Sequence, residues 1–412
     1  MSGAISIRAK AAALACALSL TLAGSLASTG VAHADAGFRN WIAGFEKTAV
    51  AAGISRSVYR AAFAGVSDPD PEVIQKAQFQ PEFKDKIWDY LDNRVNEDSI
   101  AEGQRMRTKW KPWLDRIEKR FGVDRDILLA IWSMETNYGK ILERKDVMRS
   151  LPRSLATLAY LDDRRAKFAR QQLIAALKIV QAGHVDVDGL TSSWAGAMGH
   201  TQFIPTSYLH YAADMDGDGH ANIWASVPDA LATAANLLRK NGWQSGRTWG
   251  YEVSVPAGLG SRAERTSKTM AEWRKLGFTR VNGRDFPSSS ERATLIRPSG
   301  SNGPAFLMTK NFFVIKAYNN ADKYALAVGH LADRIGGYGP LAQDWPRGYT
   351  PLSMDERYEL QQRLTHHGLY DGKIDGKIGS SSKTAIMAYQ ERAGIERDGN
   401  ASKALLDFLR KN

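Results

Sequence analysis

Residues 123–139 read VDRDILLAIWSMETNYG, and this stretch predicts a helix that is buried on most of its sides. Asp124 is a suitable N-cap, and Asp126 is favourable in the first turn. Gly139 can close the helix in the left-handed conformation that glycine adopts without steric cost. Because the residues between these ends are nearly all apolar, we expect the helix to lie in a core.

The last turn of this helix contains one acidic residue, Glu135. Trp132, Ile131 and Leu128 lie three, four and seven positions before it, so Glu135 continues an apolar face. A carboxylate there loses hydration, which raises its pKa toward the range of a general acid near neutral pH. Taken alone, the pattern also fits a glutamate that hydrogen-bonds a neighbouring loop.

Residues 1–34 have the pattern of a secretory signal peptide. Basic residues precede an apolar run over 11–26, and small residues suited to cleavage follow at 32–34. Cleavage near Ala34 predicts a soluble chain that is periplasmic or otherwise exported. No later stretch reaches the ~18 apolar residues that a membrane span needs, so no membrane span is expected.

The composition restricts the chemistry and the partners of the chain. Its 412 residues include 55 Lys and Arg against 44 Asp and Glu, for a net charge of +11, which favours anionic partners. Nucleic acid is not expected, because basic residues do not alternate with aromatic ones in a stripe and because the chain is expected to be exported. Cys16 is the only cysteine, so the remainder of the chain has no cysteine nucleophile and no cysteine-based zinc site.

The sequence pattern divides the chain beyond the signal peptide into three parts. Residues 35–340 are mostly helical in periodicity, with an inserted lobe at 245–305 that is rich in Gly, Ser and Pro and contains short β-prone pieces. Residues 341–354 are dense in helix breakers and form an expected linker. Residues 355–412 are expected to form a small helical domain, which is more often a binding module than an enzyme.

Three segments in order resemble one known family. Residues 135–139, ETNYG, resemble the Glu-Ser/Thr-x-aromatic-Gly signature of lysozyme-like transglycosylases. Residues 193–207, SWAGAMGHTQFIPTS, and residues 318–328, YNNADKYALAV, are similar to motifs of the lytic murein transglycosylase B family. The resemblance implies a mainly α fold: a lysozyme-like α+β catalytic domain with a small inserted β-containing lobe, followed by a small three-helix C-terminal binding domain.

The resemblance also implies a reaction. It is cleavage of the β-1,4 bond between N-acetylmuramic acid and N-acetylglucosamine in peptidoglycan, with formation of a 1,6-anhydromuramyl end and no net addition of water. Glu135 would be the sole catalytic acid and base, and the chemistry would need no cofactor. A hydrolytic muramidase on the same fold and an inert peptidoglycan-binding scaffold remain alternatives.

The family match further implies which residues bind the sugars. Ser193 and Gln202 would hydrogen-bond sugar or acetamido groups, and Met198 would line the cleft beside Glu135. The remaining expected substrate contacts are tyrosines of the first and third motifs, namely Tyr138, Tyr318 and Tyr324.

An acidic loop follows the second motif. Its acidic side chains Asp214, Asp216 and Asp218 have the spacing of the first ligands of an EF-hand calcium loop, and the His220 carbonyl falls at the seventh position. Position 12 is not glutamate, and by the family match Asp229 is the candidate that closes the site. We expect a structural Ca²⁺ or Na⁺ here, and the alternative is a turn in which the Asp residues bond their own backbone.

The C-terminal part resembles the peptidoglycan-binding type 1 domain over residues 356–411, through its two Asp-Gly turns and its Tyr389-Gln390 step. This resemblance implies that the module holds the enzyme near its insoluble substrate. Peptidoglycan glycan strands are therefore the expected partner of a monomeric protein, and cell-wall synthesis proteins are further candidates.

Overall fold

The computed structural model describes residues 35–78, 86–259, 263–281 and 283–411. The expected signal peptide lies outside these residues. Helices dominate, with one sheet in the inserted lobe and three helices at the C-terminus, which confirms the predicted fold class. Among the described residues, no helix has the length and apolar character required to cross a membrane.

The larger helical part holds the main hydrophobic core. In chain order its helices are α1 (Ala36–Ala51), α2 (Arg56–Ala62), α3 (Pro71–Gln78), α4 (Ile87–Arg94), α5 (Glu97–Lys109), α6 (Lys111–Phe121), α7 (Arg125–Thr136), α8 (Leu151–Leu161), α9 (Ala166–Gln181), α10 (Pro205–Tyr211), α11 (Val227–Lys240), α13 (Lys310–Ile315) and α14 (Asp322–Ile335). Two short antiparallel strands, β1 (Arg149–Ser150) and β2 (Thr191–Ser192), hold the start of α8 beside the loop that precedes α10.

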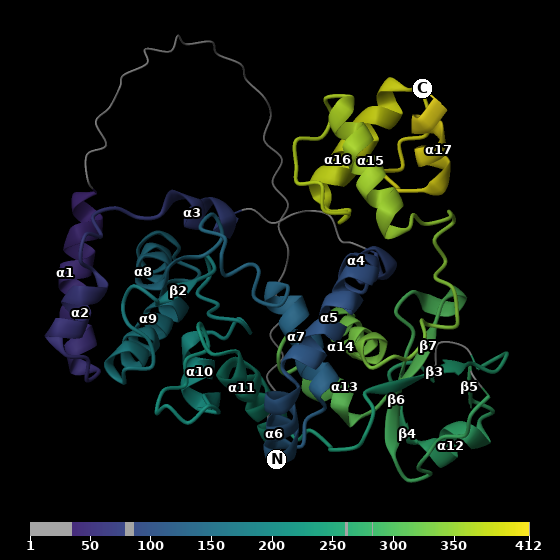
Figure 1. Cartoon of the computed structure of the whole chain (residues 1–412), viewed down its shortest axis with the longest axis horizontal. Helices are drawn as coiled ribbons and strands as arrows, with labels where there is room; N and C mark the ends of the chain where they lie inside the picture. The colour runs from purple at the N-terminus through teal and green to yellow at the C-terminus, as the bar shows by residue number, and fades with distance from the viewer. Residues whose placement is uncertain (1–34, 79–85, 260–262, 282, 412) are drawn as a thin grey trace, which may run out of the picture.

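The predicted central helix is α7, and α5, α6, α11 and α14 pack against it (Figure 1). The side chain of Asp124 accepts a hydrogen bond from the backbone N–H of Asp126, so the predicted N-cap is confirmed. The predicted end is wrong by two residues, because Asn137 rather than Gly139 is the left-handed cap, with a φ of 50°. Tyr138 also has a positive φ, of 57°. Asparagine tolerates this conformation better than most residues, so the helix ends before the glycine is reached.

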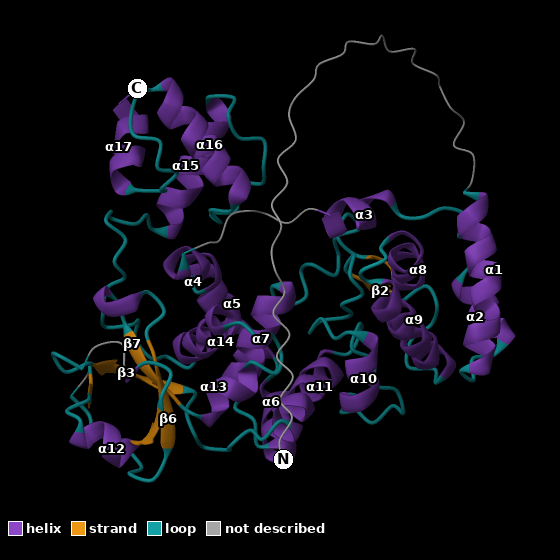
Figure 2. Ribbon diagram, turned by 180° about the vertical axis from the view of Figure 1, so that it is seen from behind, coloured by secondary structure: helices purple, strands orange, loops and turns teal. Residues whose placement is uncertain are grey.

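The inserted lobe contains a five-stranded antiparallel sheet in the order β4-β6-β7-β3-β5. Its elements are β3 (Gly250–Ser254), β4 (Ser267–Thr269), α12 (Met270–Lys275), β5 (Thr279–Arg280), β6 (Arg292–Ile296), a 3₁₀ turn η2 (Gly300–Asn302) and β7 (Ala305–Met308). The sheet has a small core of its own around Trp273 and Phe278. Figure 2 shows these strands on the opposite side of the molecule from α1 and α9.

The C-terminal domain consists of α15 (Met354–His366), α16 (Ser380–Arg392) and α17 (Lys403–Lys411) around a separate apolar core. Ser353 and Glu356 form a reciprocal capping box that fixes the start of α15. Both Figure 1 and Figure 2 place this domain beside α4.

Candidate active site

Glu135 lies in the last turn of α7, and its side chain is only partly exposed. Its Oε1 accepts a hydrogen bond of 2.6 Å from the hydroxyl of Tyr324, a buried residue of α14. Burial raises the pKa of Glu135 to about 7, although the Tyr324 hydrogen bond and the charge of Arg94 act in the opposite direction. The expected loss of hydration at this carboxylate is therefore present in the structure.

The first and second sequence motifs are joined by direct hydrogen bonds. Thr136 Oγ1, next to Glu135, donates to the backbone carbonyl of His200 at 2.6 Å. Trp132 Nε1 donates to His200 Nδ1 at 3.1 Å. Burial lowers the pKa of His200 to about 4, so its imidazole stays neutral and can accept this bond. The end of α7 is thus fixed to the loop at residues 193–207.

The third motif reaches the same place through Tyr318. Its hydroxyl donates to the backbone carbonyl of Thr201 at 3.0 Å, and its ring meets Phe203 edge-on. Burial raises the pKa of Tyr318 well above its usual value, and the nearby Glu135 charge raises it further. Segments separated by more than a hundred residues therefore surround one carboxylate.

The loop that carries Ser193 and Gln202 is tightly folded. Ser193 Oγ accepts from the backbone N–H of Ala197 at 3.2 Å, and Gln202 Nε2 donates to the Gly199 carbonyl at 2.9 Å. Gly199 has a φ of 64°, and an added Cβ would lie 2.5 Å from the carbonyl oxygen of Ile223, so only glycine fits. Both predicted polar side chains remain partly exposed.

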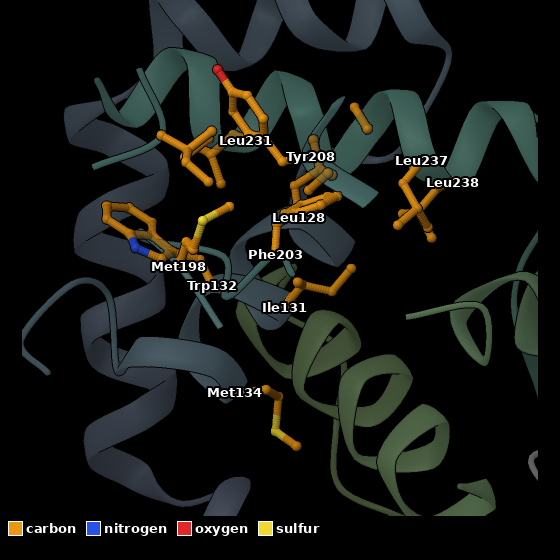
Figure 3. Close-up of a cluster of buried hydrophobic side chains, with 14 of the residues drawn as sticks. Leu128, Ile131, Trp132, Met134, Met198, Phe203, Tyr208, Leu231, Leu237 and Leu238 are labelled. Atoms are coloured by element: carbon orange, nitrogen blue, oxygen red, sulfur yellow. The ribbon is translucent and has the colours of Figure 1, made fainter. Parts of the chain in front are cut away.

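Three of the residues expected to contact sugar are buried: Tyr324, whose hydroxyl donates to Glu135, and Met198 and Tyr138, which lie in the core. Met198 has no exposed surface and lies among the apolar side chains near Trp132 (Figure 3). Tyr138 is 7% exposed, and its hydroxyl donates to the carbonyl of Ser99 at 2.8 Å. In this structure neither side chain presents a surface to a ligand, because packing and hydrogen bonding inside the protein already use it. We assign both a supporting position behind Glu135.

Two further residues near Glu135 were missed in the sequence, Tyr90 and Arg94 of α4. Arg94 Nη1 donates to the carbonyl of Met134 at 3.4 Å, and its guanidinium lies 5.7 Å from the centre of the Tyr90 ring. Burial raises the pKa of Tyr90, and the Glu135 charge contributes in the same direction. Their i, i+4 spacing places them on one helical face, but only the fold shows that this face is turned toward Glu135.

The structure brings together three of the expected metal ligands. One carboxylate oxygen from each of Asp214, Asp216 and Asp229 lies within 4.8 Å of the others. The side chain of Asp218 is outside this group, and its Oδ1 instead accepts from the backbone N–H of His220 at 2.8 Å. The expected ligand of His220 is its backbone carbonyl, and that expectation stays a prediction. The two Asp residues of the loop therefore converge with Asp229 at the start of α11.

Comparisons with known proteins agree with this geometry. The chain is 29% identical over 248 residues to the membrane-bound lytic murein transglycosylase B of Escherichia coli, covering 60% of this chain and 66% of that protein. It is 45% identical to SltB3 from Pseudomonas aeruginosa, with a TM-score of 0.72 and coverage of 90% and 99% of the two chains. SltB3 was solved in complex with NAG-anhNAM-pentapeptide and with NAG-NAM-pentapeptide.

The lytic transglycosylase Slt35 of Escherichia coli, solved in complex with calcium, is 24% identical and shares the fold, with a TM-score of 0.60 and coverage of 73% and 93%. Residues 353–409 match the model of a peptidoglycan binding domain. Residues 37–333 match the model of the transglycosylase SLT domain. The three motifs around Glu135 and this match over most of its length show that the chain belongs to the transglycosylase SLT domain family.

Proposed function

We propose that the protein is an exported lytic transglycosylase that cleaves the β-1,4 bond between N-acetylmuramic acid and N-acetylglucosamine in peptidoglycan and leaves a 1,6-anhydromuramyl end. The observation that carries this proposal is the half-buried Glu135, whose pKa is raised to about 7 where three family motifs meet. The saccharides named in the two SltB3 complexes support the same substrate class.

The proposed reaction uses one carboxyl group twice. Protonated Glu135 donates its proton to the glycosidic oxygen as the bond to the muramyl C1 breaks. The resulting carboxylate then takes the proton of the muramyl C6 hydroxyl, whose oxygen bonds to C1 and closes the anhydro ring. The proton returns to Glu135 and no water is consumed. An intramolecular nucleophile has a high effective molarity, so one carboxyl group can replace the usual pair.

The other residues of the site hold the carboxyl group and the substrate. The Tyr324 hydroxyl orients Oε1 of Glu135. Ser193, Gln202 and Tyr318 are proposed to contact the sugars, since all three are partly exposed and lie in the motifs that converge on Glu135. Among the described residues, the causes that shift the pKa of Glu135 are burial, the Tyr324 hydrogen bond and the Arg94 charge, and no neighbouring carboxylate raises it further. This surrounding favours the transglycosylase over a muramidase, which would need a second carboxylate to direct water.

The group formed by Asp214, Asp216 and Asp229 fits a hard cation such as Ca²⁺ or Na⁺. Its donors are carboxylate oxygens, and burial together with the neighbouring Asp216 raises the pKa of Asp229, which a bound cation would offset. These three residues would hold the ion, and its positive charge would offset part of their negative charge and order the loop. The proposed chemistry at Glu135 needs no contribution from it.

We further propose the following division of the chain: a signal peptide at 1–34, a catalytic domain at 35–340 with its lobe at 245–305, a linker at 341–354 and a peptidoglycan-binding domain at 355–412. The binding domain would keep a monomeric enzyme at the insoluble wall and raise the local concentration of substrate.

The direct test is digestion of purified cell wall by the wild type and by Glu135→Gln, with mass spectrometry of the products. The wild type should release muropeptides one water lighter than those with a reducing end. The variant should lose about 10²- to 10⁴-fold in rate, because glutamine cannot act as a proton donor and acceptor. Products with reducing ends would instead identify a muramidase. Equal, measurable rates for the two proteins would contradict the role of Glu135. No release of muropeptides by the wild type would favour an inert scaffold.

A further inference from the structure

Helix α4 faces two parts of the molecule. It packs against α14, the helix of Tyr324, and its residues Tyr90 and Arg94 lie near Glu135. Asp89, Asp92 and Asn93 of the same helix contact the C-terminal domain and its linker. A helix of only eight residues, with no side-chain hydrogen bond at its N-cap, depends on its neighbours for its position.

The contact with the C-terminal domain is specific. Asn93 Nδ2 donates to the carbonyl of Ile378 at 3.0 Å, and Asn93 Oδ1 accepts from the backbone N–H of Ile378 at 2.9 Å. These two hydrogen bonds use both the NH₂ and the C=O group of the Asn93 side chain. They therefore fix the orientation of α4 relative to the C-terminal domain as well as the distance between them. Ile378 belongs to the second Asp-Gly turn region, which precedes α16.

Charged groups reinforce this contact. Asp92 accepts from both terminal nitrogens of Arg347 at 2.6 and 2.8 Å, a bidentate arrangement, and it also pairs with Arg357 at 3.0 Å. Lys383 of α16 pairs with Asp89 at 2.8 Å. The side chains involved are largely shielded from solvent, so water screens these pairs less than it screens ordinary surface pairs.

We propose that the C-terminal domain positions the active site: by holding α4 through Asp89, Asp92 and Asn93, it keeps Tyr90 and Arg94 beside Glu135. This inference rests on the proposed function and deepens it. The three residues that hold α4 are positioning residues, because they act through Tyr90 and Arg94 and do not reach Glu135 themselves. A domain that served only as an anchor on the wall would need no such contacts with this helix.

The two roles differ in their effect on a short, soluble substrate. An anchor raises the concentration of enzyme at insoluble wall and has no influence on the turnover of a small glycan in solution. A positioning domain affects turnover on both substrates, because a small displacement near the reacting atoms slows the chemistry. A soluble tetrasaccharide of alternating N-acetylglucosamine and N-acetylmuramic acid with its stem peptides separates these roles.

The experiment uses the full chain and two variants on opposite sides of the contact. Asn93→Ala removes both hydrogen bonds to Ile378, and Lys383→Met removes the ion pair to Asp89 without changing the catalytic part. Tyr358→Phe is the matched control, since it removes a 2.9 Å hydrogen bond from the C-terminal domain to Asp98 on α5 rather than to α4. Thermal melting of each variant verifies that it is folded.

We expect kcat on the tetrasaccharide to fall by about tenfold in Asn93→Ala and by less in Lys383→Met, with KM changed less than kcat. The alkaline limb of the pH profile should move upward, because Arg94 would lie farther from Glu135 and lower its pKa less. The other groups that interact with Glu135 are Tyr324 on α14, Tyr318 after α13 and Tyr90 on α4, and none is altered in these variants.

The proposal is overturned if both variants, folded, retain the wild-type kcat and pH profile on the tetrasaccharide, or if Tyr358→Phe reproduces their losses. If Asn93→Ala does not fold, Lys383→Met decides by the same criteria. Failure of this inference is distinguishable from failure of the proposed function. In the first case Glu135→Gln is inactive while Asn93→Ala and Lys383→Met are normal, and in the second case Glu135→Gln is itself active.

Discussion

Glu135 and Asp229 are both carboxyl groups whose pKa is raised by burial, yet their surroundings differ. Glu135 accepts one hydrogen bond, from the Tyr324 hydroxyl. Asp229 has no exposed surface and accepts from the backbone N–H groups of Met215, Asp216 and Asn222, at 2.7, 3.4 and 2.9 Å. Backbone donors stabilise the ionised form, so Asp229 is equipped to stay charged, while Glu135 is equipped to hold and release a proton.

Under the proposed function, the same chemical group serves two purposes in one domain. The proposed cation site at Asp229 combines fixed backbone donors with nearby acidic side chains. At Glu135, apolar packing removes water without providing equivalent donors. Burial alone therefore does not indicate a catalytic acid, and the count of donors around the buried oxygen atoms separates the two cases.

The largest expected effect is on the pH dependence of the free energy of unfolding. The folded protein favours protonated Glu135, because its pKa is raised from 4.5 to about 7. This preference contributes up to about 3 kcal/mol to the free energy of unfolding. The contribution is complete below pH 4.5 and is lost as the pH rises through 7. Relative to wild type, Glu135→Gln should therefore gain stability between pH 5 and pH 8, measured by urea unfolding. Glu143→Gln, at an exposed residue, is the control, and parallel profiles for all three proteins would show that burial does not raise the pKa of Glu135.

A smaller effect is expected at the contrasting site. In Asp229→Asn, one carboxylate oxygen is replaced by an amide NH₂ group. At least one of the backbone N–H groups that donate to Asp229 then faces another donor instead of an acceptor. The cost should be about 1–3 kcal/mol in the free energy of unfolding, with turnover of the folded enzyme retained. Asp218→Asn, at an exposed carboxylate outside the three-residue group, should change stability little. If Asp229→Asn were as inactive as Glu135→Gln and also fully stable, Asp229 would have a catalytic role, contrary to the roles proposed for the two residues.

The smallest effect concerns Tyr324, whose hydroxyl donates to Glu135. Tyr324→Phe removes the 2.6 Å hydrogen bond, which lowers the pKa of Glu135, so that pKa should rise further. The alkaline limb of kcat/KM against pH should then move upward by less than about one unit. Loss of sugar contacts would change the height of this profile but not its midpoint. A limb that moves downward would show that Tyr324 does not donate to the ionised carboxylate.

Much of the fold could be predicted from local sequence. The apolar run after Asp124 identified α7, and the change of composition after residue 245 identified the lobe that carries the sheet. The end of α7 was placed two residues late, because Asn137 adopts the left-handed conformation before Gly139 is reached. Which residue ends α7 depends on how the following turn packs. The conformational preferences of single residues do not determine this packing.

Only the residues of the site that lie in the family motifs could be predicted from the sequence. The motifs placed Glu135, Tyr318 and Tyr324 together, but they did not show that Met198 and Tyr138 point into the core, since a motif does not encode side-chain direction. The role of α4 was not visible in the sequence. Its residues reach Glu135 on one side and the C-terminal domain on the other only through tertiary packing.

Glu135 is proposed to be a proton donor at neutral pH because its carboxyl group is buried and, among the described residues, one hydroxyl, that of Tyr324, donates to it. Carbon-13 NMR of the full chain with labelled glutamate side chains, with Glu135→Gln to assign the signal, measures its titration directly. A midpoint near 7 is expected. A midpoint near the ordinary value of 4.5 would mean that Glu135 is ionised at neutral pH and is not the proton donor.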